Sequence, residues 1–90
     1  MDEKQLDDFG DWKYEDSLDG YGPATRHVWI NETLNSTVKI ALSEGLHIMK
    51  CERGEWLVTI NIDGGPTDRN YCFETEEEAI SNVKDLVPTA

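Results

Sequence analysis

The chain has 90 residues, of which 38% are hydrophobic, and its 19 acidic and 8 basic side chains give a formal net charge of −11. This length supports one domain with a modest core, because a domain of about 60 residues buries only roughly 60% of the surface of its unfolded chain. A membrane helix is excluded, since no stretch approaches roughly 20 consecutive apolar residues.

The acidic charge gathers at the two ends of the chain. Residues 1–20 carry eight acids against two lysines, a net charge of −6, whereas residues 21–73 carry −1 and residues 74–90 carry −4. The first acidic segment runs into the glycine- and proline-rich stretch 19–23, a composition typical of turns and loops. We therefore divide the chain into an acidic, partly flexible N-terminal arm over 1–23 and a single α+β domain over 24–90.

Five segments after the arm have the composition or the alternation of strands, and turns separate them: 27–30, 37–42, 46–51, 56–62 and 71–73. In the second of these, Val38 and Ile40 fall on one face and Lys39 on the other. The fourth is rich in β-branched and aromatic residues, with Trp56 and Val58 on the opposite side from Leu57. Consecutive strands on short turns predict a small antiparallel β-meander of four or five strands.

One α-helix is predicted at the C-terminus, over residues 76–87. Thr75 is a good N-cap with Glu78 three residues later, which is the pattern of a capping box, and Pro88 stops the helix. An apolar stripe at helical spacing should pack on one face of the sheet. We expect most of the core from the following residues: Val38, Ile40, Leu42, Ile48, Trp56, Val58, Ile60, Ile62, Ile80, Val83 and Leu86.

Metal-ligating and nucleophilic side chains are few. His27, His47, Cys51 and Cys72 match no standard zinc spacing, and no catalytic signature surrounds either cysteine. The first residues are the reverse of a cationic, apolar signal peptide, which favours a cytoplasmic protein with both thiols reduced. We expect no enzymatic activity, no metal and no cofactor.

The arm interleaves large apolar residues with its acids, and two interpretations remain open for it. In the first, the arm docks on a partner, with Trp12 and Tyr14 as apolar anchors and the acidic charge as steering. In the second, Trp12 and Tyr14 belong to an additional edge strand and fill a gap in the core.

The charge distribution predicts a non-enzymatic module that binds a basic protein, such as an inhibitor that occupies the nucleic-acid-binding surface of its target. Direct binding to nucleic acid is not expected, because affinity for phosphate depends on basic side chains. The alternative is a cytoplasmic domain of a halophilic organism, in which acid serves solubility. The residues predicted to bind the partner are Asp7, Asp8, Asp11, Trp12, Tyr14, Glu15, Asp16, Glu76 and Glu77.

Overall fold

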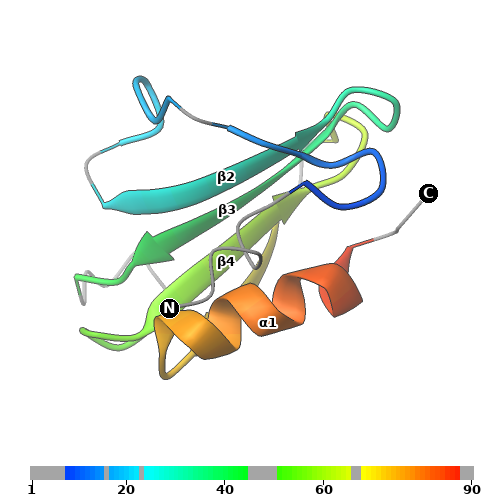
Figure 1. Ribbon diagram of the computed structural model, residues 1–90. Helices are drawn as coiled ribbons and strands as arrows, with labels where there is room; N and C mark the ends of the chain where they lie inside the picture. Colours follow the sequence, from blue (N-terminus) through cyan, green and yellow to red (C-terminus); the bar gives the residue numbers. More distant parts are fainter. Residues whose placement is uncertain (1–7, 16, 23, 45–50, 66–67, 88–90) are drawn as a thin grey trace.

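The computed structural model describes residues 8–15, 17–22, 24–44, 51–65 and 68–87. These residues form five strands followed by one helix (Figure 1): β1 (Lys13–Tyr14), β2 (Thr25–Asn31), β3 (Ser36–Leu42), β4 (Trp56–Asn61), β5 (Arg69–Phe73) and α1 (Glu76–Leu86). Each strand pairs with the next in antiparallel orientation, so the order across the sheet is β1-β2-β3-β4-β5. The predicted fold, an antiparallel meander with a C-terminal helix on one face, is confirmed.

A four-residue turn joins β2 to β3 and fixes their register. Asn31 and Ser36 face each other across its base, and Asn31 Oδ1 accepts a hydrogen bond of 2.9 Å from the N–H of Leu34. Asn35 has φ of 51°, in the left-handed region where asparagine is favoured among residues with a side chain. Because a slip of one residue would turn every side chain of a strand to the other face, this turn helps to determine which residues reach the core.

The strand register places one set of side chains beneath α1. Trp29, Val38 and Ile60 form one row across the strands, and Ile40 with Val58 forms the next. All five side chains are at most 1% exposed. In Figure 1 the helix crosses this face of the sheet, so the core lies between the two layers.

The predicted alternation of β4 is confirmed. Val58 is buried on the helix side, whereas Leu57 and Thr59 are half-buried on the other. Of the expected core residues, Val38, Ile40, Val58, Ile60 and Val83 are buried, and Trp56, Ile62, Ile80 and Leu86 pack against them half-buried. Leu42 is half-buried, and Ile48 lies outside the described residues.

The helix begins with the cap that the sequence predicts. Thr75 has an extended backbone, and its hydroxyl accepts the N–H of Glu78 at 3.1 Å. The Glu78 carboxylate in turn accepts the N–H of Glu74 at 3.1 Å, one residue earlier than a capping box requires. Within the described residues, no helix is both long enough and apolar enough to cross a membrane.

The connection between β3 and β4 differs from the expected arrangement. The predicted strand over 46–51 lies outside the described residues except for Cys51, which is in a bend. β3 pairs directly with β4, and backbone hydrogen bonds from Ser43 to Glu55 and from Gly54 to Ser43 continue that pairing. Gly54 has φ of 91°, so the turn before β4 uses a conformation that residues with a side chain rarely adopt.

Candidate functional site

The acids predicted to bind a partner lie at both ends of the described chain. Asp8, Asp11 and Glu77 are exposed, and Glu15 and Glu76 are half-buried. Asp7 and Asp16 lie outside the described residues. The described acids of the predicted partner-binding site are therefore at least partly exposed to solvent.

Trp12 lies in the core. Its side chain is 0% exposed, and its ring stacks on that of Phe9 with centroids 6.1 Å apart. Two backbone hydrogen bonds of 3.0 and 2.8 Å between Phe9 and Trp12 close a tight turn that directs both rings inward. This corrects the expectation that Trp12 is an apolar anchor for a partner, because a buried ring offers no surface to dock on. Trp12 fills the core as the second interpretation of the arm expects, but it lies just before the edge strand β1 and not in it.

Tyr14 belongs to the edge strand β1. It lies opposite Trp29 of β2, with the two rings edge to face and their centroids 5.2 Å apart. The pairing continues beyond β1, since the N–H of Glu15 donates to the carbonyl of Val28 at 2.8 Å. Tyr14 is half-buried and packs against the core. The arm is therefore joined to the sheet by backbone as well as by side chains.

A chain of side-chain hydrogen bonds links three segments that are distant in sequence. The Tyr14 hydroxyl lies 2.8 Å from Nδ1 of His27, and Nε2 of His27 lies 2.6 Å from a carboxylate oxygen of Glu76. In the neutral imidazole, one tautomer satisfies both contacts: Tyr14 donates to Nδ1, and Nε2–H donates to Glu76. The chain thus runs from β1 through β2 to the first turn of α1.

For His27 the sequence predicted a place in the strand 27–30 but no contact with Tyr14 or Glu76. The His27 side chain is 11% exposed and faces inward, on the same side of the sheet as Trp29. The alternation of β2 was the available signal, since residues two apart in a strand share a face. A hydroxyl, an imidazole and a carboxylate in this order also occur where a base activates a nucleophile. Here the three rings of Tyr14, His27 and Trp29 contact one another, and the hydrogen bonds connect β1 and β2 with the first turn of α1.

We expect Tyr14→Phe to lower the free energy of unfolding by about 1–2 kcal/mol, because it leaves the buried Nδ1 of His27 without its hydrogen bond. Urea unfolding followed by fluorescence measures the change. Tyr71→Phe is the matched control, because Tyr71 is also half-buried against the core while its hydroxyl bonds no other described residue. Equal losses of unfolding free energy in the two variants would show that the contact between Tyr14 and His27 adds nothing to stability.

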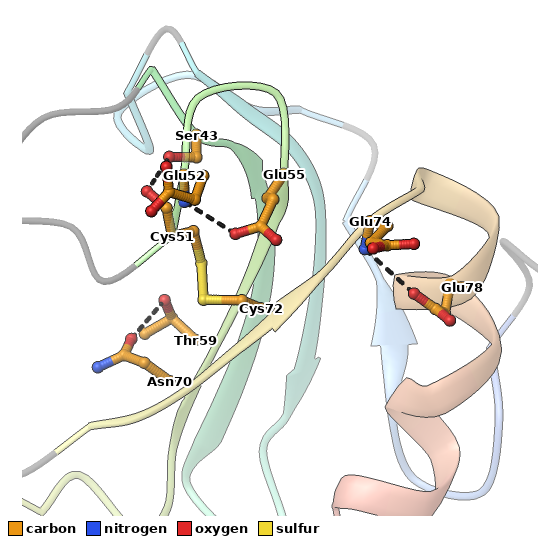
Figure 2. The surroundings of a disulfide bond; sticks show 9 residues. All are labelled: Ser43, Cys51, Glu52, Glu55, Thr59, Asn70, Cys72, Glu74 and Glu78. Atoms are coloured by element: carbon orange, nitrogen blue, oxygen red, sulfur yellow. Dashed lines mark hydrogen bonds between the residues drawn. A yellow bond between two sulfur atoms is a disulfide. The ribbon is translucent and has the colours of Figure 1, made fainter.

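The two cysteines form a disulfide, so the prediction of two reduced thiols is wrong. Cys51, in the turn before β4, is bonded to Cys72 of β5 across a sequence separation of 21, with Cα atoms 5.5 Å apart (Figure 2). That distance is typical of a disulfide. The cysteine count and the expected compartment argued against a bridge, but they carry no information on distance. The fold determines it: Cys72 lies in β5 opposite Leu57 of β4, and Cys51 is held near the start of β4 by Ser43, which bonds both Cys51 and Glu55.

A carboxylate completes a small cluster around this disulfide. An oxygen of Glu55 and the sulfur atoms of Cys51 and Cys72 all lie within 4.8 Å of one another. Glu55 is held in the turn, because its Oε1 accepts the N–H of Glu52 at 2.8 Å (Figure 2). Cys51 is buried, Glu55 is half-buried and Cys72 is exposed. Glu55 was not among the residues predicted to bind a metal or a partner, because a single acid in a turn of an acidic protein has no distinguishing sequence pattern.

Comparison of the chain with known protein families, with curated proteins and with solved structures gives no match. Its function is therefore argued from its own residues: the acids of the two ends, the Tyr14–His27–Glu76 chain and the cluster at the disulfide.

Proposed function

We propose that the protein is a non-enzymatic binding module whose acidic ends engage a basic protein, such as the nucleic-acid-binding surface of a target that it inhibits. The observation that supports this proposal most is the hydrogen-bond chain of Tyr14, His27 and Glu76. It connects Tyr14, in the acidic segment 1–20, to Glu76, at the start of the acidic segment 74–90. Described acids of both segments therefore belong to parts of the chain that are joined through the sheet.

Two described lysines, Lys13 and Lys84, belong to these two acidic segments. Lys13 lies 3.9 Å from Asp8, but the two side chains are 70% and 52% exposed, and such surface pairs contribute little. Lys84 lies over the ring of Phe9, 5.6 Å from its centroid, near the last turn of α1. Holding like charges together costs stability, whereas a basic partner would gain from a potential that is already assembled. We take this as support for a binding role of the acids.

The first turn of α1 supplies charge in a fixed position. Glu74, Glu77 and Glu78 are exposed, and Glu78 is oriented by its bond to the N–H of Glu74. Acids at a helix start are also stabilised by the helix dipole, so part of this cluster is explained by the fold alone. A test therefore has to compare variants that lose the same number of acids at different positions of the protein.

We expect the double variant Glu74→Gln, Glu77→Gln to bind an immobilised arginine-rich peptide with an association rate constant reduced by about tenfold at low salt, since steering of this kind accounts for at least that factor. The matched control is Glu32→Gln, Glu52→Gln, which removes the same charge from exposed acids of the domain. Surface plasmon resonance at several salt concentrations measures both.

The control variant should retain the association rate constant of the unmodified protein. The difference between the two double variants should vanish at high salt, where charges are screened. If both variants lose the same factor in association rate constant, the position of the removed acids does not affect binding. The acidity would then fit the alternative, a solubility adaptation in a halophilic organism, and the binding proposal would be rejected.

The cytoplasmic location that the sequence predicts belongs to this proposal as well. Disulfides are rare in cytosolic proteins, where thiols are kept reduced. In the cytosol the Cys51–Cys72 bond would therefore be a transient state of the protein, and in an oxidising compartment it would be the lasting one.

A further inference from the structure

We propose that reduction of the Cys51–Cys72 disulfide creates a zinc site formed by the two cysteine thiolates and the carboxylate of Glu55. This corner of the molecule then alternates between a covalent bridge and a metal bridge. The site is separate from the acidic ends that carry the proposed function, and it concerns residues for which the sequence predicted neither a disulfide nor a metal.

The cluster has nearly the dimensions of a tetrahedral zinc site. Zinc binds thiolate sulfur at about 2.3 Å and carboxylate oxygen at about 2.0–2.2 Å, so its ligand atoms lie about 3.5–3.8 Å from one another. The two sulfur atoms and an oxygen of Glu55 already lie within 4.8 Å of one another. Only the two sulfur atoms, which are bonded to each other in the disulfide, have to separate.

The backbone around the cluster is fixed by bonds that do not depend on the disulfide. The carbonyl of Cys51 accepts the hydroxyl of Ser43 at 2.9 Å, and the Glu52 N–H holds the Glu55 carboxylate (Figure 2). Cys72 lies within β5, paired with β4 at Leu57. Supporting hydrogen bonds of this kind orient metal ligands and raise affinity. The backbone at the two cysteines and the carboxylate of Glu55 are therefore held before any metal arrives.

The disulfide is accessible to the reaction that opens it. Cys72 is exposed, whereas Cys51 is 4% exposed. A small thiol reductant can therefore attack the sulfur of Cys72, which releases Cys51, and a second thiol then displaces the mixed disulfide. Two equivalents of thiol are oxidised to one disulfide, and each cysteine sulfur gains one electron and one proton. Zinc binding then displaces both thiol protons.

The described residues supply three ligands, and a water molecule takes the fourth position, as in zinc sites with an open coordination. Two thiolates and one carboxylate carry a charge of −3, so the bound ion leaves −1. The metal thus relieves most of the repulsion that reduction would otherwise produce among these groups. The expectation of a metal-free protein then holds for the disulfide form alone.

The experiment compares the oxidised protein with protein that has been reduced by a phosphine in metal-free buffer. Each form is titrated with Co²⁺, whose thiolate complexes absorb in the near ultraviolet, and then with Zn²⁺ as competitor. We expect one Co²⁺ per chain in the reduced form, displaced by one Zn²⁺, and none in the oxidised form. Reduced protein that binds no more metal than oxidised protein overturns the proposal, whether or not it stays folded.

Two variants test whether the carboxylate of Glu55 is a zinc ligand. Glu55→Gln should weaken zinc binding by the reduced protein at least about tenfold, the lower end of what supporting residues alone contribute. Glu52→Gln is the control, because it removes the same charge from the same turn and keeps the N–H that holds Glu55. Equal affinities in the two variants overturn the assignment of Glu55 and with it the three-ligand site.

Discussion

Trp12→Ala is expected to lower the free energy of unfolding by about 3–5 kcal/mol, the range for truncation of a large buried aromatic side chain. The ring is 0% exposed and contacts Phe9, so its removal leaves a cavity between the arm and the sheet. Domains have only about 5–15 kcal/mol of stability in total, so this one change can remove a large share of it. Chemical unfolding followed by far-UV circular dichroism measures the loss.

Asp11→Ala is the control, because Asp11 is the exposed neighbour of Trp12. It should change stability by less than about 0.5 kcal/mol, as surface substitutions usually do. Deletion of residues 1–14 should cost at least as much as Trp12→Ala, since it also removes Tyr14 and β1. A truncated chain that unfolds at the same denaturant concentration as the full chain would show that the core does not need the arm.

Cys72→Ser is expected to lower the free energy of unfolding by about 3 kcal/mol in metal-free buffer. The disulfide closes a loop with a sequence separation of 21, and the loss of chain entropy in the unfolded state has this size for such a loop. Reduction of the unmodified protein should cost about as much, and the variant should then be insensitive to reductant. Zinc has to be excluded, because a metal that binds the folded form alone would restore stability.

Ser81→Ala, at an exposed position of α1, serves as the control for the substitution itself. If the reduced and oxidised proteins unfold at the same denaturant concentration in metal-free buffer, the disulfide does not stabilise the fold.

The sequence was sufficient for the parts of the fold that depend on local pattern. The alternation in 37–42 and 56–62 predicted which side chains of β3 and β4 face the helix, and Thr75 predicted where the helix begins. These features arise from period-2 alternation and from capping, which a few adjacent residues determine. The core residues among them could therefore be named in advance.

The candidate sites depend on contacts between distant segments, which local pattern does not contain. His27 and Glu76 are 49 residues apart, and Cys51 and Cys72 are 21 apart. Their proximity follows from the pairing of β4 with β5 and from the path of the helix back across the sheet. For Trp12, composition allowed both a surface anchor and a core residue, and only its packing against Phe9 and the sheet distinguishes them.

The two-residue strand β1 also protects the protein from its own copies. It pairs with Trp29 and Ile30, the most apolar part of the seven-residue strand β2, and covers backbone groups that would otherwise form an open sheet edge. An open, apolar edge is a template on which a second chain can add a strand, the first step of aggregation. A proteolytic cut that releases the arm would therefore expose the edge of β2 at the moment that the core loses Trp12. Loss of the arm should lead to insoluble assemblies of the remaining chain.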